Sequence, residues 1–152
     1  MPDVHKRFMT RAVELAKKAK EKTHPNPLVG AVLVRNGKII GEGYHRRAGA
    51  PHAERVALGS AKGSACGADL YVSLEPCAHY GKTPPCVLNI IKSGVRKVYV
   101  AMKDPNPLVN GKGLDVLRKN GIKVRTGICR REAKQINQDY IKSMVKKRCS
   151  QA

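Results

Sequence analysis

The spacing of apolar residues predicts a helix near each end of the chain. In residues 4–20 they recur every three or four positions, and Asp3 is placed to cap the first turn. In residues 130–148 a similar pattern predicts a single closing amphipathic helix. Each helix would therefore turn one apolar face towards a core.

Between these helices, the pattern predicts strands and further helices. Residues 31–34 and 39–40 flank an Asn-Gly pair at residues 36–37, which predicts two antiparallel strands joined by a tight turn. Helices are then predicted at residues 52–61, 84–92 and 114–120, with strands at residues 70–74, 95–101 and 122–126. Because strands and helices alternate in this second half, we expect parallel pairings with helices on the faces of the sheet, and so an α/β fold.

Length and composition favour one cytoplasmic domain. A chain of 152 residues is long enough to bury a core without disulfides. It has no apolar run that could cross a bilayer, and its first residues are charged where a signal peptide would be apolar. We therefore expect a soluble protein of the cytoplasm, or of the plastid stroma if the source is a plant, with no membrane partner. In a reducing compartment, neighbouring Cys and His residues more often bind metal or take part in catalysis than form disulfides.

The chain is strongly basic, with 30 Lys and Arg residues against 11 Asp and Glu residues and a net charge of +19. This charge would attract anionic partners, whether phosphorylated metabolites or nucleic acid. A stacking surface for single strands is hard to build from one Phe, five Tyr and no Trp. Nucleic acid is therefore a possible partner but not the favoured one.

Three residues of metal-binding type surround a central loop. In PCAHYGKTPPC, Cys77 and Cys86 lie further apart than the cysteines of a structural zinc knuckle, and His52 begins a predicted helix upstream. Three protein ligands leave one tetrahedral position open, which is typical of a catalytic zinc ion, and two thiolates with an imidazole favour Zn²⁺. Glu54 would stand beside a water molecule in the open position and could shuttle its protons. The sequence thus predicts one catalytic zinc ion.

A short motif, PNPLV, occurs at residues 25–29 and again at residues 105–109. Both copies lie in predicted loops, and they could be no more than two turns fixed by proline. Alternatively, they could hold two Asn side chains at one mouth of the sheet, where α/β proteins tend to bind ligands.

Several segments together resemble a known family. They are HAE, EPCAHYGKTPPC, HPNPLVGAVLV and VAMKDPNPLVNGKGLDVLRKNGIKV, and the likeness to the diaminohydroxyphosphoribosylaminopyrimidine deaminases of riboflavin biosynthesis covers almost the whole chain. The long loop between the two cysteines is its specific part, because other deaminases with this fold usually have Cys-x-x-Cys. The resemblance implies a three-layer α/β/α cytidine-deaminase-like fold with a central mixed five-stranded sheet. It also implies zinc-dependent hydrolytic deamination of a phosphoribosylated diaminohydroxypyrimidine, with release of ammonia.

The resemblance further implies residue roles. His52, Cys77 and Cys86 match the zinc ligands, and Glu54 matches the catalytic proton shuttle. The positions that match contacts with the pyrimidine, ribose and phosphate are Asn26, His45, His79, Lys82, Thr83, Asp104 and Asn106. Both PNPLV asparagines would then face the substrate, and a homo-oligomer is expected.

Two questions stay open at this point. Bacterial members of the family usually continue into a reductase domain after a segment like residues 136–140, whereas residues 1–152 are expected to form a single deaminase domain without one, either as a stand-alone enzyme or as a piece of a longer protein. The substrate could also be cytosine or adenine in nucleotides or nucleic acid. A third hypothesis for the function, besides these two kinds of deaminase, is a zinc-containing binding module without enzymatic activity.

Overall fold

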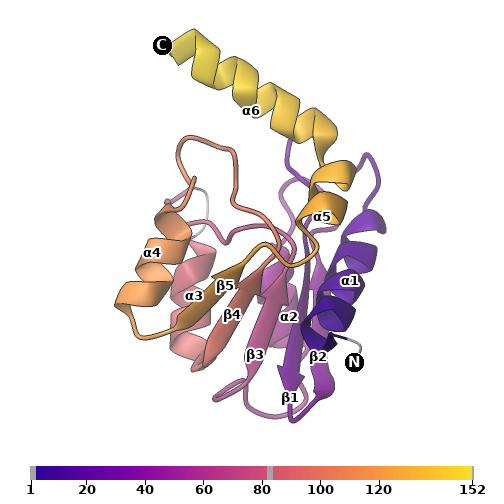
Figure 1. Ribbon diagram of the computed structural model, residues 1–152, viewed down its shortest axis with the longest axis vertical. Coiled ribbons are helices and arrows are strands. Elements are labelled where there is room, and N and C mark those ends of the chain that lie inside the picture. Colours follow the sequence, from indigo (N-terminus) through magenta and orange to yellow (C-terminus); the bar gives the residue numbers. More distant parts are fainter. Residues whose placement is uncertain (1–2, 82–83, 152) are drawn as a thin grey trace.

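A mixed five-stranded sheet forms the centre of the molecule (Figure 1). The structure is a computed structural model that describes residues 3–81 and 84–151. The strands are β1 (Gly30–Arg35), β2 (Lys38–Tyr44), β3 (Asp69–Val72), β4 (Lys97–Val100) and β5 (Lys123–Thr126). The helices are α1 (Val4–Lys17), α2 (Ala53–Gly59), α3 (Cys86–Ser93), α4 (Lys112–Lys119), α5 (Arg130–Ile136) and α6 (Gln138–Gln151). In the described ranges, every helix is too short or too polar to span a membrane.

The strand order β2-β1-β3-β4-β5 follows from the connections between the strands. Asn36 and Gly37 both have positive φ, 50° and 75°, as a two-residue hairpin turn requires, so β1 and β2 pair antiparallel. β1 is also antiparallel to β3, whereas α3 and α4 cross over between strands that pair in parallel, β3 with β4 and β4 with β5. The predicted α/β class and mixed five-stranded sheet are confirmed.

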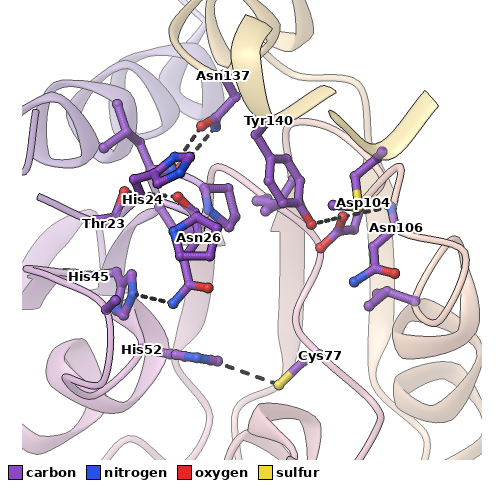
Figure 2. A pocket seen from close by; sticks show the side chains of 18 of the residues that line it. Thr23, His24, Asn26, His45, His52, Cys77, Asp104, Asn106, Asn137 and Tyr140 are labelled. Carbon is purple, nitrogen blue, oxygen red and sulfur yellow. Dashed lines mark hydrogen bonds between the residues drawn. The ribbon is translucent and has the colours of Figure 1, made fainter. Parts of the chain in front are cut away.

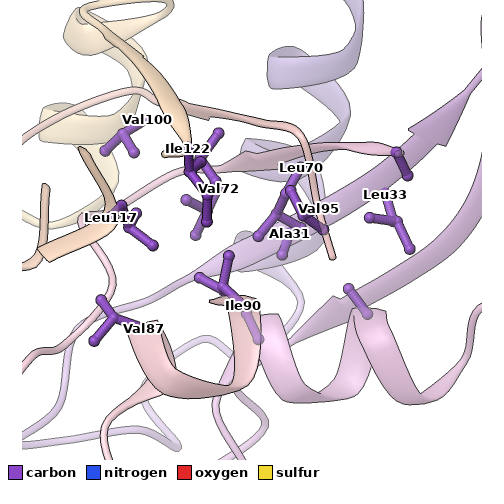
Figure 3. Close-up of a cluster of buried hydrophobic side chains, with 14 of the residues drawn as sticks. Ala31, Leu33, Leu70, Val72, Val87, Ile90, Val95, Val100, Leu117 and Ile122 are labelled. Atoms are coloured by element: carbon purple, nitrogen blue, oxygen red, sulfur yellow. The ribbon is translucent and has the colours of Figure 1, made fainter. Parts of the chain in front are cut away.

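Helices cover both faces of the sheet. Alternate side chains of a strand point to opposite faces, so Leu33 belongs to an apolar cluster shared with α2, α3 and α4, whereas Val32 belongs to one shared with α1 and α5. Figure 3 shows the first of these layers, in which Ile90 of α3 lies beneath Leu70 of β3. The two apolar layers hold the sheet between helices and make its edges the places where loops can form a site.

The described segments with predicted site residues meet at one end of the sheet. β1 begins there and β2 ends there, because Gly30 is paired with Tyr44. β3 also ends there, since the N–H of Ser73 donates to the carbonyl of Gly30, and parallel β4 ends beside β3. Segments 23–29, 45–52, 73–77 and 101–106 are therefore neighbours in space.

The prediction of one closing helix over residues 130–148 is wrong. The chain forms two helices, α5 and α6, which are separated at Asn137. There the backbone leaves the helical conformation, with φ −119° and ψ 26°, and the Asn137 side chain bonds to the backbone of Leu28. Beyond this break, α6 extends away from the body of the molecule (Figure 1).

The helix predicted from residue 84 begins at Cys86 instead. Its cap is Pro85, in an extended conformation with φ −60° and ψ 143°. A residue that precedes a proline is disfavoured in the helical conformation, so Pro84 cannot readily start the helix before Pro85. Thr83, the predicted cap, lies outside the described residues. This later start makes Cys86 the first residue of α3.

Candidate metal centre and active-site cavity

Three side chains with metal-binding atoms converge at the end of the sheet. The Nδ1 atom of His52 lies 3.1 Å from the sulfur of Cys86 and 3.9 Å from the sulfur of Cys77. All three ligand atoms lie within 4.8 Å of one another. His52 immediately precedes α2, Cys77 follows β3, and Cys86 opens α3, so three separate segments supply the cluster.

The geometry of this cluster fits a zinc ion. Zinc bond lengths of about 2.0–2.3 Å in a tetrahedral site place two ligand atoms roughly 3.6 Å apart, which is close to the separations from His52 to the two sulfurs. Two sulfurs and one imidazole nitrogen are donors that zinc prefers. Among the described residues the cluster has three such donors, so a fourth position would stay open to the cavity, as in catalytic zinc sites.

The surroundings of Cys77 favour its thiolate form. Its hydrogen bond with the Cys86 side chain, together with those from His52 and the Cys86 N–H, lowers the pKa of Cys77 to about 4. The backbone N–H of Cys86 lies 3.2 Å from the Cys77 sulfur. A thiolate is the form of cysteine that binds metal, so the protein prepares this sulfur as a ligand.

Glu54 is a buried carboxyl group in the wall of the same cavity. It is the second residue of α2 and only 3% exposed. Burial raises the pKa of Glu54 to about 7, although the nearby His52 acts in the opposite direction. Near neutral pH, a carboxyl group with this pKa populates both its protonated and its ionised form.

A cavity of about 1490 Å³ opens over the cluster (Figure 2). The predicted site residues in its wall are Asn26, His45, His52, Glu54, Cys77, His79, Asp104 and Asn106. Cys86 is buried next to it, within reach of His52. Lys82 and Thr83 lie outside the described residues. The structure thus brings together every predicted site residue that it describes.

The first PNPLV loop holds Asn26 against His45. The Nδ1 atom of His45 lies 3.2 Å from the carbonyl of Pro51, which can only accept, so Nδ1 carries the proton. Nε2 is then an acceptor for the amide nitrogen of Asn26, 3.2 Å away. Burial lowers the pKa of His45, which favours this neutral form. The amide oxygen of Asn26 is left facing the open centre of the site (Figure 2).

The second PNPLV loop is folded around Asp104 and Asn106. The carboxylate of Asp104 accepts the N–H of Asn106 at 2.9 Å, and the side-chain oxygen of Asn106 accepts the N–H of Leu108 at 3.0 Å. Burial raises the pKa of Asp104. With its oxygen occupied, Asn106 directs its amide nitrogen towards the cavity (Figure 2). The two asparagines therefore present an acceptor and a donor to the same space.

Glu75 is an organising residue that the sequence patterns did not reveal. It is 3% exposed, and its carboxylate accepts hydrogen bonds from four backbone N–H groups at 2.9–3.4 Å. The donors are Asp104, Gly111, Gly113 and Leu114. Glu75 thus ties the segment that carries Cys77 to the second PNPLV loop and to the start of α4. The available signal was an acidic residue placed directly after the strand predicted at residues 70–74.

Two further residues in the cavity wall were also missed, Asn137 and Tyr140. Asn137 bonds to the backbone of Leu28, and the Tyr140 hydroxyl donates to Asp104 at 2.7 Å. Both lie in the segment for which one amphipathic helix was predicted, where Tyr140 fits as a residue of the apolar face. Its hydroxyl, by contrast, contacts the site.

Comparisons with known proteins agree on this chain's relatives. Residues 2–102 match the model of the cytidine and deoxycytidylate deaminase zinc-binding region. The riboflavin biosynthesis protein RibD of Aquifex aeolicus is 53% identical over 96% of this chain, which spans 41% of that protein. A diaminohydroxyphosphoribosylamino-pyrimidine deaminase of Buchnera aphidicola subsp. Schizaphis graminum is 48% identical over 90% of this chain and 93% of its own length. The solved structure of Acinetobacter baumannii RibD superimposes with a TM-score of 0.90 at 51% identity, covering 93% of this chain and 40% of that one.

Proposed function

The chain belongs to the family of deaminases with the cytidine and deoxycytidylate deaminase zinc-binding region. We propose that it removes an amino group, by hydrolysis, from a phosphoribosylated diaminohydroxypyrimidine. One observation above all carries the proposal. The buried carboxyl of Glu54 lines the same cavity as a cluster of three zinc-type ligands. The name of the Buchnera relative, which this chain matches over nearly its full length, supports the choice of substrate.

His52, Cys77 and Cys86 would hold one zinc ion. When bound, zinc acts as a Lewis acid that makes water acidic enough to attack near neutral pH. The histidine and the two cysteines lie just before α2, after β3 and at the start of α3, so three separate parts of the fold fix the ligand set. Their contribution to the reaction is a rigid position for the metal at the floor of the cavity.

Glu54 would move the protons of the reaction. Deamination breaks the bond from the ring carbon to the amine nitrogen and forms a bond from that carbon to the oxygen of water. In this scheme Glu54 takes a proton from the water and delivers it to the departing nitrogen, which leaves as ammonia. Its burial in the cavity wall keeps bulk water from competing for that proton.

The polar groups of the two PNPLV loops would recognise the pyrimidine. The oxygen of Asn26 and the amide nitrogen of Asn106 supply an acceptor and a donor for the edge of a ring that itself carries donors and acceptors. His45, His79 and Asp104 add polar groups around the same space.

The phosphate end of the substrate needs cationic partners. Lys20, Arg55 and Lys147 are basic residues in the described wall of the cavity. Lys82 and Thr83 belong to the proposed phosphate contacts as well, on the strength of the family resemblance. The cavity volume of about 1490 Å³ is ample for a molecule of nucleotide size. We assign the deamination step to residues 1–152, which would act as a single domain.

The test is ammonia release from the phosphoribosylated diaminopyrimidine by protein of measured zinc content. The wild type should turn over, and Glu54→Gln should keep its zinc while its kcat falls by about 10²–10⁴-fold, the usual contribution of a general acid–base residue. Glu14→Gln, which changes an exposed carboxylate on α1, is the matched control. A zinc-loaded wild type that releases no ammonia would refute the proposed substrate.

The same proposal includes self-assembly. β2 is an edge strand of the sheet, and Ile39 on it is 41% exposed. An apolar side chain on an unpaired edge is suited to contact with a second copy of the chain. Light scattering should then report a multiple of the chain mass of 16.6 kDa, and a single-chain mass would contradict this part of the proposal.

A further inference from the structure

The two PNPLV loops are each held by one side chain from the junction between α5 and α6. Asn137, the residue between these helices, contacts the loop at residues 25–29, and Tyr140, in the first turn of α6, contacts Asp104 beside the loop at residues 105–109. We call Asn137 and Tyr140 the junction pair. Figure 2 shows both side chains at the rim of the cavity, next to the segments that carry Asn26 and Asn106, with the Tyr140 hydroxyl directed at Asp104.

Asn137 binds the first loop as a neighbouring strand would. Its side-chain oxygen accepts the N–H of Leu28 and its side-chain nitrogen donates to the carbonyl of Leu28, both at 2.8 Å. Asn137 is only 4% exposed, so water does not compete for these bonds. Leu28 lies two residues after Asn26, and the next residue, Val29, accepts the N–H of His45 at 3.0 Å. Asn137 therefore fixes the backbone at Leu28, which links Asn26 to the residue that binds the backbone of His45.

Tyr140 binds the carboxylate of Asp104, the residue directly before the second PNPLV loop. Its hydroxyl donates to Oδ1 of Asp104 at 2.7 Å, and the same oxygen accepts the N–H of Asn106 at 2.9 Å. Burial raises the pKa of Tyr140, so the phenol stays protonated and acts as the donor. The bond holds Asp104 in the rotamer that also fixes the backbone of Asn106.

We propose that the junction pair positions both PNPLV loops to receive the substrate. This inference rests on the proposed function. Neither residue is in the metal cluster. Their effect should therefore appear in substrate binding, whereas the chemical step should be spared.

The way α6 lies supports a positioning role. Over residues 142–147, where side-chain burial is described, Met144 is buried and its neighbours are exposed, and α6 extends away from the sheet (Figure 1). A helix that packed only for stability would bury a continuous apolar face. Here the contacts are concentrated where α6 meets the two loops.

Steady-state kinetics of zinc-loaded Asn137→Ala and Tyr140→Phe test the proposal. KM should rise about tenfold or more in each variant, because a hydrogen bond that orders a binding loop is lost, while kcat should stay within about twofold. Asn120→Ala is the matched control for Asn137, since Asn120 also follows a helix but its side chain donates to the carbonyl of Val116 in that same helix. Tyr44→Phe is the control for Tyr140, because Tyr44 lies outside the cavity wall.

Two kinetic outcomes would overturn the proposal. One is a KM equal to that of the wild type in both variants. The other is a parallel loss of kcat, zinc and thermal stability, which would mean that the pair serves only to stabilise the fold. If Asn137→Ala does not fold, Tyr140→Phe decides, since it removes one oxygen atom.

Amide hydrogen exchange gives a readout that needs no turnover. Asn137→Ala should speed exchange of the Leu28 N–H, and Tyr140→Phe should speed exchange of the Asn106 N–H, with the β4 amides unchanged. If the wild type releases no ammonia, the proposed function fails, and amide hydrogen exchange alone then tests whether the junction pair orders the two loops. Unchanged exchange at both loops would overturn the inference, whatever the substrate.

Discussion

The backbone N–H of Cys86 donates a hydrogen bond to the sulfur of Cys77, with 3.2 Å between nitrogen and sulfur. The next N–H of α3, that of Val87, donates to the carbonyl of Cys77, also at 3.2 Å. The start of α3 is thus bonded directly to the segment after β3. The long loop between the two cysteines can therefore carry substrate contacts without having to hold the metal ligands in place.

Loss of either thiolate should abolish stable zinc binding. In Cys77→Ser and Cys86→Ser, zinc affinity should fall more than about a hundredfold, because even residues that merely support ligands change it by up to that factor. Zinc per chain after dialysis against a weak chelator, measured by mass spectrometry, checks this. Cys66→Ser, at an exposed free cysteine, should retain one zinc ion per chain. Equal retention in all three variants would put the metal elsewhere.

Glu75→Gln should destabilise the fold although it removes no apolar contact. The amide nitrogen of Gln cannot accept, so some of the four backbone N–H groups around residue 75, three of them in buried bonds, lose their partner. We expect a loss of about 2–4 kcal/mol in the free energy of unfolding, measured by urea denaturation. Glu132→Gln, at an exposed position of α5, should change it by less than about 0.5 kcal/mol. A Glu75 variant as stable as this control would contradict the structural role.

Stability should depend on pH through the ion pair of Arg11 and Glu42. Arg11 binds the carboxylate with two hydrogen bonds, of 2.6 Å and 3.1 Å, and its side-chain bond lowers the pKa of Glu42 below its ordinary value of 4.5. The folded protein then binds this proton less tightly than the unfolded chain. The stabilisation is therefore present above pH 4.5 and is lost as the pH falls through the lowered pKa.

Arg11→Met exposes this contribution. At pH 7 the variant should be less stable by about 1 kcal/mol or less, because both side chains are about one third exposed, and the difference should vanish in acid. Urea denaturation at a series of pH values measures it. Arg118→Met breaks a more exposed pair with Asp115, at 3.9 Å, and should show almost no such dependence. A difference that persists well below pH 4.5 would mean that Arg11 acts through packing.

Asn26→Ala should weaken binding of the proposed substrate. The variant removes the oxygen that faces the cavity and leaves Nε2 of His45 without its donor. We expect kcat/KM for ammonia release to fall about tenfold or more, with zinc retained. Asn110→Ala, at an exposed asparagine outside the cavity wall, is the control. Equal values for the two variants would exclude the first PNPLV loop from substrate binding.

Local patterns were sufficient for much of the fold. The turn at Asn36 and Gly37 could be predicted because positive φ at both positions calls for these residue types. The candidate ligands could be identified because histidine and cysteine at such positions have few other uses in a reducing compartment. The start of α3 was predicted two residues too early, because Pro84 was placed in the first turn although the proline after it disfavours the helical conformation there.

Residues whose role depends on distant partners could not be found in this way. Asn137 lies 109 positions from Leu28, and the break between α5 and α6 is visible only once that loop is in place. The partners of Glu75 are backbone groups 29 to 39 positions further on, and a backbone N–H has no signature in a sequence. Tyr140 fits an apolar pattern equally well whether or not its hydroxyl has a partner.

The direction of β1 has a practical consequence. β1 begins at the cavity end of the sheet and runs away from it, so the turn at Asn36 and Gly37 lies at the opposite end. Both turn residues are exposed. A fluorophore or a surface linker attached at this turn would leave the cavity open to solution, which suits the protein to immobilised biosensor and single-molecule formats.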